Sequence, residues 1–308
     1  MKITKFFIAV SISLTASVAS STERIYIQSP YSPSHSGTPA MLRIIDEANS
    51  SQDRYKFFLE YRPGGEQIIA INQLDKDPQN KLAIIAPKFV EHVHAGKLNE
   101  SDYVPVHALG DACWAVISNL GPRPQGIDNL RGVKEVVVGG VGIGNATHMT
   151  SLQLAEKYGF TVRYVPFKSN FEALILMVSD GSINLVMDRV VNYRQIKEKS
   201  PSLKMLGMSC PTRHPLAPDL PTLKEQGLEA PYVFNITIAH KTMNEKKRKE
   251  ISKILENATR KIGADKIQDL SDMTPPYFTG VDLDTYHRDS ISLMKKLIQK
   301  HQLSIKSN

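Results

Sequence analysis

The residues with the clearest capacity for chemistry follow a short apolar segment, residues 136–138, near the middle of the 308-residue chain. A glycine-rich stretch comes next, and then Asn145, Ala146 and Thr147 precede a segment whose apolar residues have helical spacing. The pattern predicts a strand, a glycine turn and a helix. Such a turn directs free backbone N–H groups, at the positive end of a helix, toward a ligand above the strand. We therefore expect a site for an anion or a polar small molecule, and a tight turn without a ligand is the alternative.

Two nucleotide-binding motifs can be tested against this turn, and both fail. The G-x-G-x-x-G fingerprint needs a third glycine where the two registers place Asn145 or Thr147. The Walker pattern needs a lysine after its last glycine, whereas Gly144 is followed by Asn145. We therefore expect neither a nucleotide nor any other cofactor.

Charge and motif content argue against nucleic acid, metal and catalysis. The net charge of +7 comes with 38 scattered basic residues, without the basic stripe interleaved with aromatic residues that marks a nucleic-acid surface. His92 and His94 lack a third ligand nearby, so no metal site is expected. The chain contains no G-x-S-x-G motif and no conspicuous pair of carboxylates. An enzyme is therefore not expected, and an exported hydrolase is a minor alternative.

The N-terminus has the features of a secretory signal peptide. Lys2 and Lys5 precede a short apolar segment at residues 6–14, and small residues follow. This arrangement predicts cleavage near residues 19–21, so that residues 1–21 are removed. No later segment approaches the ~20 apolar residues of a membrane-spanning helix. The expected product is a soluble, exported protein.

Cys113 and Cys210 are the two cysteines of the chain. In an oxidising compartment they can form a disulfide. The alternative is a pair of buried thiols that act as small hydrophobic side chains, and the sequence does not decide between them. Neither cysteine lies in a motif typical of a nucleophile.

Strand patterns and helix patterns alternate over most of the chain. Such alternation predicts sheets with parallel strands, in which ligands lie beyond the carboxyl ends of the strands. A fresh α/β unit begins after an expected strand at residues 112–119. We expect one lobe from residues 22–110 and 238–308, a second lobe from residues 111–237, and a hinge where the chain crosses between them.

A second polar loop follows the first expected strand, at residues 24–29. Thr38 followed by Pro39 is a typical helix start, so this segment repeats the strand, loop and helix arrangement. The side chains of this loop that we expect at a ligand are those of Tyr31, Ser34, His35, Ser36 and Thr38. His35 is expected to add positive charge near its usual pKa of ~6.5, and a solvent-exposed loop histidine is the alternative.

These features together resemble the periplasmic solute receptors of the tripartite tricarboxylate transporter family, the Bug-type binding proteins. The resemblance covers nearly the whole mature chain, and its most specific segments are residues 142–148 (GIGNATH), residues 165–168 (VPFK), the strand end at Met187 and Asp188, and residues 218–227 (PDLPTLKEQG). It implies an α/β, two-lobed periplasmic-binding-protein (Venus flytrap) fold. Each lobe would be a mostly parallel sheet flanked by helices, with a hinge of crossing strands. The ligand would lie between the two strand-to-helix loops.

The second lobe is expected to contribute one side of the ligand site. Its expected residues are Gly142, Gly144, Asn145, Ala146, Thr147, His148, Phe167 and Asp188. Asp188 is alternatively a helix N-cap, and the two roles are compatible. The turn that follows Pro63 is the expected edge of the pocket, with Gly64, Gly65 and Glu66.

The first loop departs from the family pattern. That pattern is Pro-Gly-Gly followed shortly by an aspartate, whereas residues 33–38 read PSHSGT. Glu66 stands where the family keeps small residues, and it either caps a helix, disfavours a second anionic group or attracts an amine. The ligand's identity therefore does not follow from the resemblance, and specificity is expected to lie around Ser34, His35 and Ser36.

We expect binding without chemistry. The glycine turn would hold a carboxylate through backbone N–H groups, directly or through water. The resemblance implies a monomeric receptor that delivers a small organic acid to a separate integral-membrane permease of a tripartite tricarboxylate transporter. A ligand sensor that signals to a membrane partner is the alternative function.

Overall fold

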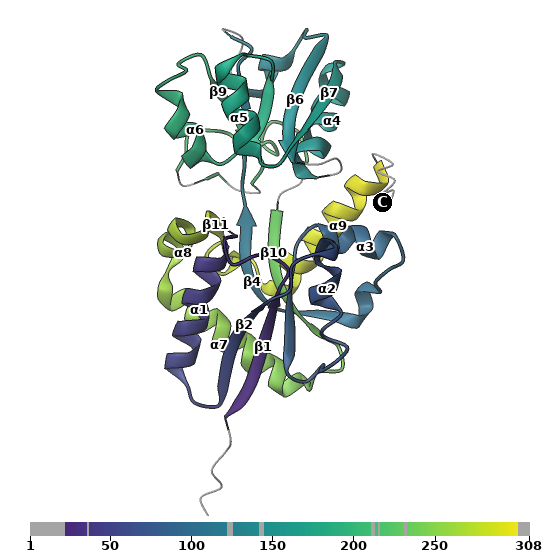
Figure 1. The fold of residues 1–308 in the computed structure, drawn as a ribbon, viewed down its shortest axis with the longest axis vertical. Helices are drawn as coiled ribbons and strands as arrows, with labels where there is room; N and C mark the ends of the chain where they lie inside the picture. The colour runs from purple at the N-terminus through teal and green to yellow at the C-terminus, as the bar shows by residue number, and fades with distance from the viewer. Residues whose placement is uncertain are drawn as a thin grey trace, which may run out of the picture.

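A computed structural model describes residues 22–35, 37–121, 126–141, 145–210, 213–214, 216–230 and 233–300. These residues form two α/β lobes, which Figure 1 shows one above the other. In the described part of the chain, lobe 1 is built on a six-stranded sheet and lobe 2 on a five-stranded sheet. The expected signal peptide, residues 1–21, lies outside the described residues.

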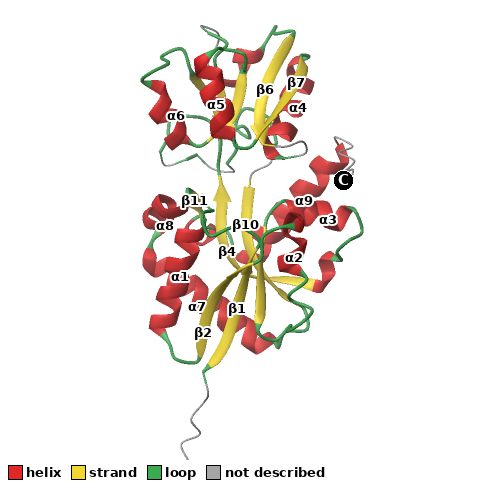
Figure 2. Ribbon diagram, in the orientation of Figure 1, coloured by secondary structure: helices red, strands yellow, loops and turns green. Residues whose placement is uncertain are grey.

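Lobe 1 takes its strands from both ends of the chain, and its sheet has the order β11-β4-β10-β3-β1-β2. The strands are β1 (Glu23–Ser29), β2 (Tyr55–Tyr61), β3 (Lys81–Ile85), β4 (Tyr103–Ala112), β10 (Val233–His240) and β11 (Met273–Thr274). Helices α1 (Thr38–Ser51), α7 (Glu245–Ile262) and α8 (Ala264–Ser271) pack on one face, and α2 (Ile68–Ile71), α3 (Lys88–His94) and α9 (Leu283–Lys300) pack on the other. Figure 2 shows these helices on both sides of the strands. Leu82 and Ile84 belong to one of the two hydrophobic cores and Ala83 and Ile85 to the other, so β3 is apolar throughout because both of its faces are buried.

Lobe 2 uses the middle of the chain, with the strand order β7-β6-β8-β5-β9. The strands are β5 (Ala115–Ser118), β6 (Glu135–Val141), β7 (Thr161–Phe167), β8 (Leu185–Asp188) and β9 (Lys204–Met208). Helices α5 (Asn170–Ser179) and α6 (Val190–Lys197) pack on one face, and α4 (Ala146–Tyr158) packs on the other. Each sheet is thus covered on both faces, as expected for α/β proteins.

Short-range sequence signals account for several helix ends. Asn145 Oδ1 accepts a hydrogen bond from the His148 N–H at 3.0 Å, and Ser169 Oγ accepts one from the Glu172 N–H at 3.2 Å. Gly159, with φ of 75°, ends α4 in the left-handed conformation. At α1 the N-cap residue is Gly37 and Thr38 is already helical, one residue earlier than the sequence predicts.

Both sheets are mixed, whereas the sequence predicts mostly parallel ones. In lobe 1, β1 pairs in parallel with β2 and β3, but β10 runs antiparallel to β3 and β4. In lobe 2, β6 pairs in parallel with β7 and β8, but β5 runs antiparallel to β8 and β9. The antiparallel pairs involve β4, β10 and β5, the strands next to the crossings, because a chain that leaves one lobe and returns to it must run in both directions.

The first crossing differs from the single strand expected at residues 112–119. β4 ends at Ala112 and belongs to lobe 1, and β5 starts at Ala115 and belongs to lobe 2. Gly110 of β4 has φ of 108°, and a Cβ atom there would lie 2.0 Å from Thr274 O. Glycine is therefore required at this position, and it interrupts the apolar pattern of the strand. The expected lobe boundaries at residues 110 and 237 stay predictions, although all of β10 pairs within lobe 1.

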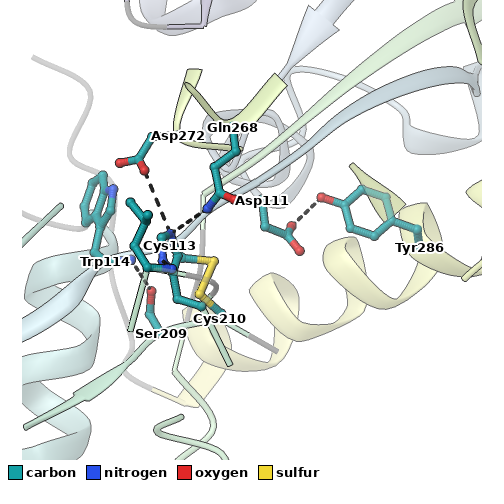
Figure 3. Close-up of a disulfide and its surroundings, with 10 residues drawn as sticks. Asp111, Cys113, Trp114, Ser209, Cys210, Gln268, Asp272 and Tyr286 are labelled. Atoms are coloured by element: carbon teal, nitrogen blue, oxygen red, sulfur yellow. Dashed lines mark hydrogen bonds and ion pairs between the residues drawn. A yellow bond between two sulfur atoms is a disulfide. The ribbon is translucent and has the colours of Figure 1, made fainter. Parts of the chain in front are cut away.

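A disulfide between Cys113 and Cys210 closes the base of lobe 2, with the two Cα atoms 5.0 Å apart (Figure 3). Cys113 follows β4, and Cys210 follows β9. Beside it, the Trp114 N–H donates to Ser209 Oγ at 3.0 Å and the Ser209 N–H donates to Trp114 O at 2.9 Å. The chain is thus anchored to β9 as soon as it enters lobe 2.

A buried carboxyl group lies just before this anchor. Asp111 of β4 is buried and accepts a hydrogen bond from the Tyr286 hydroxyl of α9 (Figure 3). Burial raises the pKa of Asp111 to about 7, because the ionised form loses its hydration and the Tyr286 hydrogen bond offsets this in part. The crossing strand therefore carries a group that titrates near neutral pH.

Removal of the disulfide should destabilise the protein by about 4–5 kcal/mol, because the bond closes a loop of 97 residues in the unfolded chain. Urea unfolding of the Cys113→Ala/Cys210→Ala variant measures the loss. A reductant should lower the midpoint of the wild-type chain and leave that of the double variant unchanged. Equal midpoints for both chains under both conditions would show that the bond does not stabilise the fold.

The pKa of Asp111 predicts a pH dependence of stability. Because this pKa is higher in the folded than in the unfolded chain, the stabilisation by Asp111 is complete below about pH 4 and is lost as the pH rises through about 7. Relative to Asp111→Asn, the wild-type chain should lose up to roughly 1.4 kcal/mol of unfolding free energy per pH unit in that window. Urea unfolding at several pH values measures the difference, and parallel stability curves for the two chains would contradict the assignment.

Candidate functional site

The strand directions place two sets of strand ends opposite each other. In lobe 1, β10 runs antiparallel to both β3 and β4, so β4 has the same direction as β1, β2 and β3. After β4 the chain continues into lobe 2. The carboxyl ends of these strands therefore face lobe 2. In lobe 2, β5 leads away from lobe 1 and β6 and β8 run back toward it, so their carboxyl ends face lobe 1. Ligands of α/β sheets bind beyond such strand ends, which makes the space between the lobes the candidate site.

On lobe 2, the start of α4 carries polar atoms without partners. Asn145 uses its Oδ1 to cap the helix, while its Nδ2 is buried and has no hydrogen-bond partner among the described residues. The buried Oγ1 of Thr147 also has no partner within the described part of the chain. Backbone N–H groups in the first turn of a helix likewise have no intrahelical acceptor. This rim can therefore donate hydrogen bonds to an anion or a polar ligand.

Of the other residues expected at the ligand here, Ala146 and His148 are described by the structure. Ala146 is buried at the first turn of α4. The His148 ring contacts the Tyr164 ring edge to face, with centroids 4.7 Å apart. Gly142 and Gly144 lie outside the described residues.

A glycine sets how closely α4 approaches β6. A Cβ atom on Gly140 would lie 2.5 Å from the Tyr164 hydroxyl oxygen and 2.8 Å from Thr147 Cγ2. The adjacent Val141 N–H donates to Asn170 Oδ1 at 3.0 Å. The end of β6 is thus held against Tyr164 and Thr147 on one side and Asn170 on the other.

Phe167, expected at the ligand, packs partly buried against the core between the lobe 2 sheet and α5. Its Cε2 atom would lie 3.2 Å from a Cβ atom on Gly139. The side chain therefore covers the end of β6, and a contact with ligand stays a prediction.

On lobe 1, an aromatic stack forms the opposite rim. The Tyr31 and His35 rings stack with centroids 3.7 Å apart and planes 6° apart. The Tyr31 hydroxyl donates to Asn235 Oδ1 of β10 at 2.9 Å, and burial raises the pKa of Tyr31, so this hydroxyl stays protonated. Asn235 is buried, and its Nδ2 has no hydrogen-bond partner among the residues described. Lobe 1 thus also presents a buried donor.

His35 does not carry the positive charge expected from the sequence. Burial and, to a lesser extent, the nearby charge of Arg189 together lower the pKa of His35 to about 4. Its Nδ1 accepts a hydrogen bond from the Gly37 N–H at 3.1 Å, which leaves the proton of the neutral ring on Nε2. His35 is therefore a neutral donor near pH 7.

The other side chains of this loop mainly bond within it. The exposed Ser34 hydroxyl lies 2.9 Å from the Ser32 hydroxyl, and the buried Thr38 hydroxyl donates to Ser32 O at 3.4 Å. Ser36 lies outside the described residues. These bonds stabilise the loop and leave Ser34 and His35 facing the groove described next.

A groove of ≈ 570 Å³ separates the lobes beside this loop. Lobe 1 lines it with Pro33, Ser34, His35 and Pro39 and with the end of α8. Lobe 2 lines it with Arg189, Val191 and Leu216. Arg189 and Asp272 form an ion pair across it, with Nε and Oδ2 3.6 Å apart. Neither residue was predicted from the sequence as part of the site.

A buried histidine supports this ion pair from lobe 2. His214 Nδ1 accepts a hydrogen bond from the Leu216 N–H at 3.1 Å, so the neutral ring carries its proton on Nε2. That nitrogen lies 3.1 Å from Gln268 Nε2 and 3.8 Å from Asp272 Oδ1. A turned Gln268 amide, with its oxygen in place of Nε2, accepts the His214 Nε2 proton. Burial lowers the pKa of His214, although the charge of Asp272 acts in the opposite direction. The ring therefore joins the lobes as a neutral donor.

Asp188 lies at the end of β8, as predicted. Its Oδ1 accepts hydrogen bonds from the Arg189 N–H at 2.8 Å and from Asn192 Nδ2 at 3.0 Å, so the carboxylate bonds the start of α6. Burial raises the pKa of Asp188 despite these bonds. Its Oδ2 is buried and has no partner among the described residues, and a ligand contact stays a prediction.

The turn after β2 is held in an uncommon conformation. Gly64, Gly65, Glu66 and Gln67 have φ values of 107°, 53°, 49° and 84°, and such values cost free energy in residues other than glycine. Gln67 Oε1 accepts a hydrogen bond from the Ala86 N–H at 3.0 Å, and Glu66 pairs with Lys88 at 3.4 Å. Glu66 is therefore paired with a cation rather than bonded to a helix start, and its place at the pocket edge stays a prediction.

Comparison with known proteins identifies the family. A family model described as "Tripartite tricarboxylate transporter family receptor" (TctC) matches residues 128–303, more than half of the chain. The chain belongs to this family. The resemblance inferred from the sequence is thereby confirmed, and the matched region includes Asn145, Asp188, Arg189 and Asp272.

Solved structures and a curated relative show what the chain is similar to. A TctC solute-binding protein from Polaromonas has a TM-score of 0.74 at 17% identity, over 90% of this chain and 98% of that one. MatC from Rhodopseudomonas palustris with bound malate has a TM-score of 0.62 at 16% identity, over 89% and 99%. The UPF0065 protein in the tcbD–tcbE intergenic region of Pseudomonas sp. (strain P51) is 23% identical over 205 residues, which are 63% of this chain and 60% of that relative. The two-lobed periplasmic-binding-protein fold is confirmed, and family and fold are those of solute-binding proteins.

The described residues contain neither a candidate membrane span nor a candidate metal cluster. No helix among them is long and apolar enough to cross a membrane. Within the same residues no group of three or more His, Cys, Asp or Glu side chains is arranged to hold a metal ion.

Gly140→Ala should destabilise lobe 2 by about 1–3 kcal/mol, because the added Cβ overlaps Tyr164 and Thr147. Removal of the Tyr164 hydroxyl should recover part of this loss in the Gly140→Ala/Tyr164→Phe variant. Urea unfolding of both variants and of Tyr164→Phe alone measures the coupling. A Gly140→Ala chain as stable as the wild type would show that the close approach is not required.

Proposed function

We propose that the chain is an exported receptor that captures a small carboxylate-containing molecule between its lobes and delivers it to a tripartite tricarboxylate-type membrane permease. The observation that carries the proposal is a pair of buried amide donors on opposite rims, Asn145 Nδ2 of lobe 2 and Asn235 Nδ2 of lobe 1, without partners among the described residues. Unsatisfied buried donors are costly, so a ligand that accepts from both would favour the closed arrangement.

The start of α4 is the proposed position of the first carboxylate. A charge-assisted hydrogen bond contributes roughly 1.5–3 kcal/mol, and the end of the helix adds about 0.3–1 kcal/mol. Three or four such bonds, less the cost of ordering, would reach the ~8 kcal/mol of a micromolar complex. The neutral Tyr31 and His35 side chains would hold the other part of the ligand as hydrogen-bond donors and as an aromatic surface.

The family relationship supports a carboxylate as the ligand class. The related MatC structure contains bound malate, a small organic acid. The crossing strands β4 and β10 provide a hinge, and a ligand that contacts both lobes would shift the population toward closure. A permease that recognises the closed receptor would then receive the ligand.

A panel of carboxylates tests the proposal. Acetate, succinate, malate, adipate and citrate are titrated into purified mature protein, with unfolding temperature and calorimetry as measurements. At least one should raise the unfolding temperature in a saturable way, with a Kd in the micromolar range. A rise with a sugar or a metal salt and with none of the carboxylates would refute the carboxylate function.

A pair of helix-cap variants tests the role of Asn145. Asn145→Ala and Ser169→Ala each remove the N-cap of a lobe 2 helix, and each should cost about 1 kcal/mol of stability. Asn145→Ala should also weaken carboxylate binding roughly tenfold or more, because it removes the Nδ2 donor. Ser169→Ala, the matched control, should bind as the wild type does. Equal affinities in calorimetry for the two variants would place the ligand elsewhere.

A further inference from the structure

We propose that Arg189 binds a second anionic group of the ligand, and that Asp272 pairs with Arg189 in the absence of ligand. This inference rests on the proposed carboxylate function and narrows its substrate class to dianions such as dicarboxylates. Arg189 would then decide between ligands that share the first carboxylate and differ in the second group.

The position of Arg189 follows from the sheet of lobe 2. β6 and β8 are neighbouring parallel strands with Gly139 opposite Val186. Continued by two residues, this register puts Val141 level with Asp188, one strand spacing of about 4.8 Å away. Arg189 therefore begins one strand away from the end of β6, the strand that precedes α4, whose start is the proposed position of the first carboxylate.

The guanidinium of Arg189 is available to a ligand. Its side chain is 34% exposed and lines the groove together with His35. At 3.6 Å the Nε–Oδ2 contact to Asp272 is an ion pair longer than a hydrogen bond. Within the described residues no hydrogen bond holds the guanidinium, whose fork of donors matches a carboxylate. A ligand carboxylate would therefore form better contacts with Arg189 than Asp272 does.

Asp272 is suited to compete with a ligand carboxylate for the guanidinium of Arg189. It ends α8 in the left-handed conformation with φ of 60°, which residues other than glycine, asparagine and aspartate adopt rarely. Its side chain is 11% exposed, and its second oxygen faces the proton of His214 Nε2 at 3.8 Å. Asp272 would thus keep a partner after a ligand displaces it from Arg189.

His35 faces Arg189 from the opposite lobe. Both side chains line the groove, and the Arg189 charge lowers the pKa of His35. Because His35 is neutral, it adds a hydrogen-bond donor without repelling the guanidinium. A second carboxylate placed here would contact a cation from lobe 2 and a neutral donor from lobe 1.

Matched ligand pairs test the inference in calorimetry. The probes are succinate, glutarate and adipate, each compared with its own monoamide, which has one carboxylate and nearly the same shape. The wild-type chain should bind at least one diacid about tenfold or more tightly than its monoamide, as expected for a charge-assisted contact. Arg189→Gln should reduce that ratio to about threefold or less while monoamide binding stays within about threefold of the wild type.

Two further variants distinguish ligand recognition by Arg189 from a structural role of this residue or a general effect of charge. Asp272→Asn keeps the left-handed conformation accessible and removes the competing charge, so it should bind the diacid several-fold more tightly. Arg163→Gln also removes one positive charge from lobe 2, but Arg163 pairs with Glu135 near the opposite ends of the strands. Its diacid preference should equal that of the wild type.

The outcomes distinguish this inference from the proposed function. If the wild-type chain binds no carboxylate, the proposed function fails and the role of Arg189 fails with it. If it binds a diacid but Arg189→Gln keeps the diacid preference, or loses both ligands equally, the function stands and Arg189 is a structural partner of Asp272. Should Arg189→Gln not fold, Asp272→Asn decides, and unchanged or weaker diacid binding by that variant would overturn the inference.

Discussion

β4 and β10 lie side by side in the lobe 1 sheet, paired antiparallel, and they are the strands that adjoin the passages between the lobes. β4 leads away from lobe 1 and β10 returns to it. Because β10 is antiparallel to both β4 and β3, strands β1, β2 and β3 run in the same direction as β4. The carboxyl ends of β1–β3 consequently face those of β6 and β8. The polar loops of both lobes meet at one place, and the ligand site is a consequence of this pairing.

The two rims of the cleft differ in charge. Lobe 2 presents a helix start and Arg189, whereas lobe 1 presents Tyr31 and Asn235 beside a histidine that burial keeps neutral. The groove also contains the carboxylate of Asp272, which pairs with Arg189 across the lobes. The positive potential of the site thus comes mainly from lobe 2, and lobe 1 supplies neutral donors and the competing anion.

Local signals predicted much of the fold from the sequence, because they act over a few residues. The caps at Asn145 and Ser169 and the helix end at Gly159 are of this kind. Contacts between distant segments could not be predicted in this way. Arg189 meets Asp272 only because the fold brings them together, and the ionisation of His35 depends on burial. One signal was present in the sequence: Arg189 directly follows a strand end expected to face the cleft.

The disulfide has a consequence for how the chain is made. Cys113 leaves the ribosome 97 residues before Cys210, so for that interval its thiol has no partner within its own molecule. The chain contains two cysteines, and an incorrect disulfide can therefore form only with another molecule. Errors in oxidation should appear as covalent dimers or as mixed disulfides with small thiols, and never as a monomer with an incorrect internal disulfide. Purification of the correctly oxidised protein thus reduces to a separation by size and by free-thiol content.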